Sequence, residues 1–256
     1  MTRRMVTYVP GLYKIFDEIL VYAADNKRRD PSMDSLRVEV DAARCRISIY
    51  YNGQGLPNEL HPEEGVYVPE MTFGHLSNNY EEVTGGSGVK LANLFSMEFV
   101  IETVDNRLEK KYEQVIFSEN MGKMSEPEIT ICLKGINWTR ITFKPDLAKF
   151  HMTHLDDDII ALMKKRVADM AGFLGTTVQV VFNGRMFQRV QSFPNYVYSY
   201  IRGANKDRKE QELQSIGERV NDQLEVCVTR SDGTFEQVSS CRFCVKPHFC
   251  KSCGVL

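Results

Sequence analysis

The sequence predicts an α/β fold of the α+β kind, in which two long helices lie against a mixed, mostly antiparallel sheet. Two observations predict it. Apolar residues recur at helical spacing in two segments, Pro10–Arg29 and His154–Phe173. Between and after these segments, short runs alternate apolar with polar residues, which is typical of strands with one buried face.

The first helix is predicted by an apolar stripe and by its end. Asp30 stands before Pro31, and a residue before a proline avoids the α region, so the helix ends there. Glu18 and Tyr22 are four residues apart, so their side chains are neighbours on the helix surface. The residues that form the apolar stripe are Leu12, Ile15, Ile19 and Ala23. In the second helix the inward residues are Ile159, Ile160, Met163, Val167 and Met170.

Strands are expected in most of the remaining chain. The turn residues 41–44 join the first two strands in a hairpin, and Asn183-Gly184 predicts a second tight turn. Asn58–Glu82 is expected to be mostly loop, with Phe73 and Leu76 as apolar anchors. The seven expected strands are Leu36–Val40, Arg46–Tyr51, Glu98–Thr103, Lys111–Phe117, Glu128–Leu133, Thr139–Phe143 and Thr176–Phe182. A later hairpin is expected from Gln223–Thr229 and Thr234–Val238.

Composition narrows the class of protein. The chain has 256 residues, 32 Lys and Arg against 34 Asp and Glu, and a formal net charge of −2. Non-specific nucleic-acid binding driven by overall charge is therefore not indicated. The hydrophobic fraction of 43% is ordinary for a globular protein. No apolar run approaches the length of a membrane span, so no membrane partner is expected.

A glycine-rich stretch precedes a short helical pattern. Gly85-Gly86-Ser87-Gly88 is followed by Lys90, and then by Leu91, Leu94 and Phe95 at helical spacing. A flexible loop that enters a helix directs free N–H groups and a positive dipole end at one point, which suits a phosphate. Lys90 adds a positive charge there. The alternative is an ordinary glycine-rich turn, since the stretch does not match a Walker A sequence.

A second glycine loop follows a strand, at Gly53-Gln54-Gly55. Two glycines one residue apart allow the backbone to approach a ligand closely. The alternative is a plain surface turn.

The order of these parts resembles the GHKL ATPases, the superfamily of gyrase, Hsp90, histidine kinases and MutL. The chain is still more similar to the N-terminal ATPase region of eukaryotic DNA topoisomerase II, from about Val6 to about Ser239. The stretches that carry this resemblance are Val9–Val21, Ala23–Lys27, Tyr67–Met71, Phe73–Leu76 and Thr142–Leu147.

The resemblance implies a two-layer sandwich of the GHKL or Bergerat type that binds ATP and Mg²⁺ under a glycine-rich lid. Glu18 stands where the family has the glutamate that activates the attacking water, a role that a carboxylate facing a pocket can fill. The positions that match the family's nucleotide-binding residues are Tyr22, Tyr51, Gly53, Gly55, Ser77, Asn78, Asn79, Gly85, Gly86, Ser87, Gly88 and Lys90.

Three departures from the family pattern imply weak or lost ATP hydrolysis, as in a pseudoenzyme. Tyr22 replaces the asparagine that holds Mg²⁺, and a phenol is a poor ligand for this small, hard cation. Tyr51 replaces the residue that reads the adenine amino group, so its ring would occupy the space of the base. The lid at Gly85–Lys90 is about three residues shorter than the family's, too short to wrap three phosphates with successive N–H groups.

The resemblance also predicts a truncated copy with three parts. Residues 1–204 are expected to form the GHKL-like domain, residues 205–240 the beginning of a transducer-like domain, and residues 241–256 a divergent cysteine-rich tail. The family's DNA-cleaving domains would lie beyond the chain, so DNA is expected as a partner only within a larger assembly. The resemblance implies a nuclear location, with a cytoplasmic one as the alternative.

The tail carries a C-x2-C-x5-C-x2-C pattern, formed by Cys241, Cys244, Cys250 and Cys253. Two such pairs would suit a tetrahedral Zn²⁺ site. The spacer between them is short for a zinc ribbon, and the alternative is a tail with exposed, reduced thiols.

Three functions remain open from the sequence. The first is a DNA topoisomerase II-like nucleotide-binding domain with weak or lost ATP hydrolysis and no DNA-cleaving part. The second is an active ATPase module of an ATP-dependent type II DNA topoisomerase. The third is a non-catalytic interaction protein that pairs with a topoisomerase II subunit and modulates it.

Overall fold

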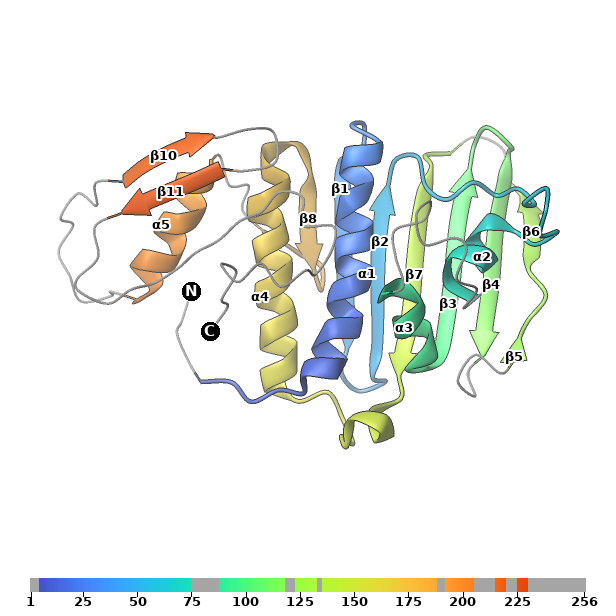
Figure 1. Ribbon diagram of the computed structural model, residues 1–256, viewed down its shortest axis with the longest axis horizontal. Coiled ribbons are helices and arrows are strands. Elements are labelled where there is room, and N and C mark those ends of the chain that lie inside the picture. Colours follow the sequence, from blue (N-terminus) through green and yellow to red (C-terminus); the bar gives the residue numbers. More distant parts are fainter. Residues whose placement is uncertain are drawn as a thin grey trace.

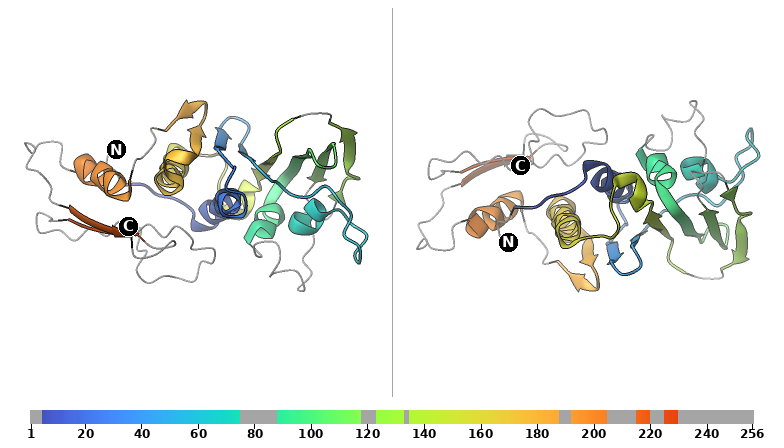
Figure 2. Two further views of the ribbon diagram at one scale, coloured as in Figure 1. Left: turned by 90° about the horizontal axis from the view of Figure 1, so that it is seen from above. Right: turned by 90° about the horizontal axis from the view of Figure 1, so that it is seen from below.

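Two layers make up the main body of the molecule, a sheet and a set of helices that cover one of its faces (Figures 1 and 2). The computed structural model describes residues 5–74, 88–117, 123–132, 135–187, 192–204, 215–219 and 225–229. The predicted α+β class with a mostly antiparallel sheet is confirmed. Among the described segments, no helix is both long and apolar enough to cross a membrane.

The sheet has nine strands in the described part of the chain, in the order β5-β4-β3-β7-β2-β1-β8-β9, with β6 paired to β4. All pairs are antiparallel except β1 and β8, which run parallel. The strands are β1 Ser35–Asp41, β2 Arg46–Asn52, β3 Ser96–Asp105, β4 Lys110–Phe117, β5 Lys123–Met124, β6 Glu128–Ile131, β7 Trp138–Pro145, β8 Gln179–Phe182 and β9 Arg185–Met186.

The two predicted long helices form as α1, Pro10–Arg29, and α4, Asp157–Leu174. The predicted stripe of α1 is buried, with Ile15 the most exposed member at 4%. Helix α4 begins later than His154 because the Asp156 carboxylate caps it, accepting hydrogen bonds from the N–H groups of Asp158 and Ile159. An ion pair of 2.6 Å between Arg166 and Asp17 joins the two helices.

The prediction of a loop over Asn58–Glu82 was wrong in part, because α2 spans Val68–Gly74. The side chain of Phe73 is fully buried in the main core, which confirms it as an anchor. Burial in the core therefore ordered a short helix that local composition alone does not favour. Leu76 lies outside the described residues. Helix α3, Gly88–Leu94, follows and contacts both α1 and α2.

A smaller group of elements lies beside α4. Helix α5, Phe193–Ala204, packs on the strands β10, Ser215–Arg219, and β11, Glu225–Thr229. The sequence predicted β11 but neither α5 nor β10, and β11 pairs with β10. The expected partner, Thr234–Val238, lies outside the described residues. The Tyr196 hydroxyl donates a hydrogen bond of 2.8 Å to Asp169 of α4, which links this group to the main body. The domain boundaries at 204 and 240 stay predictions.

The turn at Asn183-Gly184 between β8 and β9 forms as predicted. Both residues have positive φ, +46° for Asn183 and +73° for Gly184, as a tight hairpin turn of this kind requires. The Asn183 amide also exchanges two hydrogen bonds with the backbone of Val40 in β1, at 2.7 and 3.1 Å. The turn therefore also fixes the position of β8 beside β1.

Candidate nucleotide site

Glu18 lies in the contact between α1 and α3. Its side chain is 16% exposed and forms an ion pair with Lys14, one turn earlier on the same helix. Gly88 is the first residue of α3, and a Cβ atom there would overlap the Glu18 carboxylate. The two helices therefore approach this closely only because residue 88 has no side chain.

Tyr22 follows Glu18 by one helical turn and faces the interior, with 5% of its surface exposed. Its ring meets Phe73 of α2 edge-on, with the ring centroids 5.4 Å apart. Its hydroxyl interacts by hydrogen bonding with that of Tyr51 in β2, a residue that is only 1% exposed. Thr139 of β7 is the second hydrogen-bonding neighbour of Tyr51. The two tyrosines therefore fill one interior space between α1, α2 and the sheet.

Burial keeps both phenols in the neutral form. Removal from water raises the pKa of Tyr22 and of Tyr51 above the usual value, and it is the largest cause in each case. The Arg29 guanidinium acts in the opposite direction on Tyr22, 4.9 Å from the ring centroid. Arg29 also donates a hydrogen bond of 3.4 Å to the carbonyl oxygen of Tyr22.

The Gly53-Gln54-Gly55 loop lies against side chains of the chain itself. The Gln54 N–H donates a hydrogen bond of 2.5 Å to Asp30. This bond is the largest cause that holds the pKa of Asp30 below its usual value. Gly53 has φ +96°, and a Cβ atom on Gly55 would overlap the Thr139 hydroxyl. Both positions require glycine. The two glycines allow the loop backbone to pack closely against the protein's own side chains.

The remaining predicted site residues are either buried in α3 or outside the described part of the chain. Lys90 is 5% exposed within α3, so its side chain is buried rather than presented to solvent. Six nucleotide-binding candidates lie outside the described residues: Ser77, Asn78, Asn79, Gly85, Gly86 and Ser87. The four cysteines of the proposed zinc site also lie outside them: Cys241, Cys244, Cys250 and Cys253. Of the predicted site residues that the structure describes, Glu18, Gly88, Tyr22 and Tyr51 lie together.

The donors at this place do not fit Mg²⁺. The cation prefers small oxygen ligands in octahedral geometry, usually carboxylates and waters. Tyr22 offers a neutral phenol whose oxygen is engaged with Tyr51 and whose ring is enclosed by Phe73 and Arg29. Throughout the described part of the chain, no three His, Cys, Asp or Glu side chains are grouped so that they could hold a metal.

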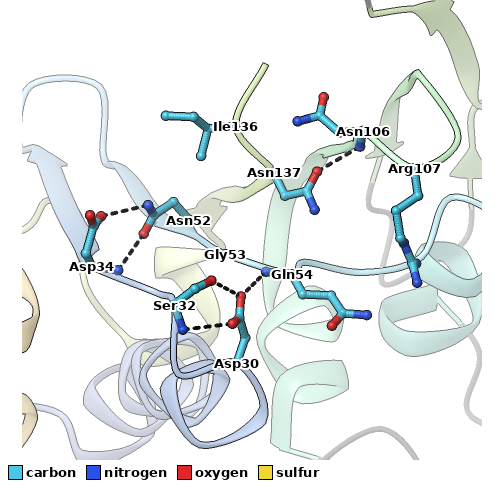
Figure 3. A pocket seen from close by; sticks show the side chains of 10 residues that line it. All are labelled: Asp30, Ser32, Asp34, Asn52, Gly53, Gln54, Asn106, Arg107, Ile136 and Asn137. Atoms are coloured by element: carbon cyan, nitrogen blue, oxygen red, sulfur yellow. Dashed lines mark hydrogen bonds between the residues drawn. The ribbon is translucent and has the colours of Figure 1, made fainter. Parts of the chain in front are cut away.

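An open, polar cavity of about 580 Å³ is lined in part by Gly53 and Gln54 (Figure 3). Neither Tyr22 nor Tyr51 lines it. Its polar groups bind one another: Asn52 donates to Asp34 at 2.8 Å, and the Asn106 N–H donates to Asn137 at 2.7 Å. This cavity is thus separate from the space that the two tyrosines fill.

Sequence reasoning missed the partners of the two tyrosines. Thr139 of β7, Phe73 of α2 and Arg29 at the end of α1 enclose the pair. Phe73 was expected only as an apolar anchor. The alternation of β7 places Thr139 on the buried face, which was the one available signal that it could approach Tyr51.

Comparison with known proteins gives consistent matches. The chain is 57% identical over 248 residues to DNA topoisomerase 2 of Arabidopsis thaliana, a match that covers 93% of this chain and 17% of that protein. It is 42% identical over 258 residues to DNA topoisomerase 2 of Saccharomyces cerevisiae, covering 93% and 18%. The chain thus spans less than a fifth of the length of these curated relatives. No protein-family model matches it.

Solved structures agree with these matches. The ATPase region of Saccharomyces cerevisiae topoisomerase II superposes with a TM-score of 0.80 at 43% identity, covering 92% of this chain and 62% of that one. The 43K ATPase domain of Thermus thermophilus gyrase B superposes with a TM-score of 0.62 at 22% identity, which supports the fold alone.

Proposed function

We propose that this chain, a homologue of the ATPase region of DNA topoisomerase II, keeps the fold of that region but binds ATP weakly and hydrolyses it little or not at all. The observation that carries the proposal is the contact between Tyr22 and Tyr51. Their side chains are 5% and 1% exposed and occupy one space between α1 and the sheet.

The position of this contact supports the proposal. Tyr22 stands at the family's Mg²⁺ position and Tyr51 at its adenine position. A nucleotide could enter only if both rings left the core, because interiors are close-packed and do not hold a second group in the same volume. Expelling two aromatic rings would also give up their burial, which is worth about 1.5–3 kcal/mol for a side chain of this size.

Glu18 is the second element of the proposal. Its carboxylate is engaged with Lys14 and lies against Gly88. A general base must reach the proton that it abstracts. With the Mg²⁺ position occupied by a phenol, Glu18 has no metal-bound nucleotide to act on, and we expect it to serve the contact between α1 and α3.

Titration calorimetry with Mg²⁺ and a non-hydrolysable ATP analogue tests the proposal. We expect at most weak binding by the unmodified chain and at least tenfold tighter binding by the Tyr22→Asn/Tyr51→Asn variant, a gain of about 1.4 kcal/mol or more. Tyr50→Asn is the matched control, since Tyr50 is adjacent but lies on the opposite face of the sheet, and we expect it to bind no better than the parent.

One result would overturn the proposal in favour of the active ATPase module. This result is steady ATP turnover by the unmodified chain that Glu18→Gln abolishes. Binding of the analogue by the unmodified chain, with no gain in the double asparagine variant, would equally remove the role given to the two tyrosines.

A further inference from the structure

The described helices of the main body lie on one face of the sheet and leave the other face uncovered (Figure 2). Strand alternation places cationic and aromatic side chains on this uncovered face. Strand residues alternate between faces, so Tyr50 points away from the core that Ile49 and Tyr51 enter. The register places Arg37 of β1 on one side of Tyr50 and Arg140 of β7 on the other. Tyr50 is thus flanked by two arginines.

Ring contacts hold this row together. The guanidinium carbon of Arg37 lies 5.2 Å from the centroid of the Tyr50 ring, and that of Arg140 lies 5.7 Å from it. Arg140 also lies 5.3 Å from the ring of Trp138, whose centroid is 5.7 Å from that of Tyr50. We call these four residues the Tyr50 platform. It presents two half-buried aromatic rings beside two guanidinium groups.

Charged side chains of both signs surround the Tyr50 platform. Arg46 and Lys144 share its face, and Arg46 is paired with Glu98 at 3.2 Å. The region holds four cations, Arg37, Arg46, Arg140 and Lys144, and four carboxylates, Glu39, Asp41, Glu98 and Glu102. Any attraction for a phosphate therefore comes from the two arginines of the platform and not from a net positive charge of this face.

Both arginines of the Tyr50 platform have guanidinium N–H groups that can bind a ligand. Arg140 approaches Glu102 at 3.5 Å, with 44% of the Arg140 side chain exposed. An exposed pair at that distance is weak in water. Arg37 uses its Nε–H for the Ser35 hydroxyl at 3.2 Å, and this leaves the two terminal nitrogens of its guanidinium group to bind an anion. A small hollow of about 60 Å³ lies between them, and it is lined by Arg37, Glu39, Ser48, Tyr50 and Arg140.

We propose that the Tyr50 platform binds single-stranded nucleic acid, with bases stacked on Tyr50 and Trp138 and phosphates held by Arg37 and Arg140. Aromatic rings beside cationic groups are the combination that binds exposed bases and their backbone without sequence preference. Duplex DNA keeps its bases stacked inside and would use only the arginines. An acidic peptide would also leave the rings unused. The proposal is independent of the nucleotide site, which lies on the opposite face of the sheet.

The test uses Trp138, the only tryptophan of the chain, as a reporter inside the site. The probe is an oligothymidylate of about 12 nucleotides, within the usual range of site sizes. We expect it to quench the Trp138 fluorescence in a saturable manner at low salt. Tyr50→Ala is expected to weaken binding about fivefold or more, which corresponds to the loss of one stacked base. Tyr50→Phe keeps the ring and is expected to bind as the parent does.

The arginines are tested through salt dependence. Arg37→Gln and Arg140→Gln are each expected to reduce the slope of log K against log salt by about 0.7, the value for one phosphate contact on a single strand. Lys164→Gln is the matched control, because Lys164 is exposed on α4 in the helical layer and the substitution removes the same charge. It is expected to leave binding and slope unchanged. A melting curve for each variant verifies that it is folded.

Any of three results would overturn the proposal. The first is the absence of quenching by oligothymidylate. The second is a loss of affinity in Lys164→Gln equal to that in Arg37→Gln. The third is binding of a DNA duplex or of polyglutamate as tightly as the single strand, since neither ligand needs the aromatic rings.

Discussion

The carboxylate of Glu18 occupies the space that a Cβ atom on Gly88 would need. The relationship joins residues 70 positions apart and determines how closely α3 approaches α1.

Gly88→Ala is expected to destabilise the protein by about 1–3 kcal/mol, the usual cost of inserting an atom into a packed contact. Helix propensity alone predicts the opposite sign, because Ala is better than Gly in a helix by about 1 kcal/mol. Urea unfolding measures the difference. Glu18→Ala in the same chain should relieve most of the cost, and Gly135→Ala, where a Cβ atom meets nothing closer than 3.7 Å, is a matched control expected to be nearly neutral. A stabilised Gly88→Ala variant would contradict the contact.

The hydroxyls of Tyr22 and Tyr51 are expected to be energetically coupled. Tyr22→Phe or Tyr51→Phe leaves the other buried hydroxyl without this partner, at a cost of about 1 kcal/mol each. The double variant should lose less than the sum of the two by about 0.5–1 kcal/mol, because it removes both polar groups together. A double-mutant cycle in urea measures this coupling. Strictly additive losses would mean that the two hydroxyls do not interact.

The ion pair between Asp17 and Arg166 is expected to stabilise the packing of α1 on α4. Their side chains are 19% and 23% exposed, and Arg166→Leu would leave the Asp17 carboxylate half-buried without this partner. We expect a loss of about 2–3 kcal/mol in urea unfolding, somewhat below the cost of breaking a fully buried pair.

Two further variants control for that measurement. Asp17→Leu/Arg166→Leu should recover part of the loss, since it removes both charges. Arg44→Ala breaks an exposed pair with Asp41 and is expected to change stability by less than about 0.5 kcal/mol. Equal losses in Arg166→Leu and Arg44→Ala would show that burial of the pair does not matter.

Asp30 should make the Gly53–Gly55 loop sensitive to acid. Its pKa is held below the usual value, first by the N–H of Gln54 and next by the Ser32 hydroxyl. A carboxyl group whose pKa is lower in the folded state contributes stability above its unfolded pKa of about 4, and that contribution is lost as the pH falls through the folded value. Asp30→Asn should therefore be less stable than the parent at neutral pH.

The difference should narrow as the pH is lowered below about 4, where Asp30 of the parent becomes protonated as well. Urea midpoints of the two proteins at several pH values measure it. A difference that stays constant down to strongly acidic pH would exclude the carboxylate as its source.

Much of the architecture could be predicted from local patterns. The spacing of Leu12, Ile15 and Ile19 determines α1, and Asn183-Gly184 determines a turn, because both depend on neighbours in the chain. Helix α2 could not be predicted in this way. It has seven residues, too few for a stable isolated helix, and the burial of Phe73 orders it.

The candidate site was predictable in part. The resemblance placed Tyr22 and Tyr51 at two family positions, one on a helix and one on a strand. It could not show that their hydroxyls meet, because that contact depends on how α1 lies across β2. The contact of Gly88 with Glu18 has the same origin. The Tyr50 platform needed the register of three strands, which no local pattern contains.

The parallel pairing of β1 with β8 has a consequence for the synthesis of the protein. Leu36 pairs with Val180, so this edge of β1 has no partner until more than half of the chain has left the ribosome. Until then its free N–H and C=O groups are a template for pairing with another chain. A fragment that ends before Gln179 would keep this edge open, and aggregation of nascent or shortened chains would begin at β1.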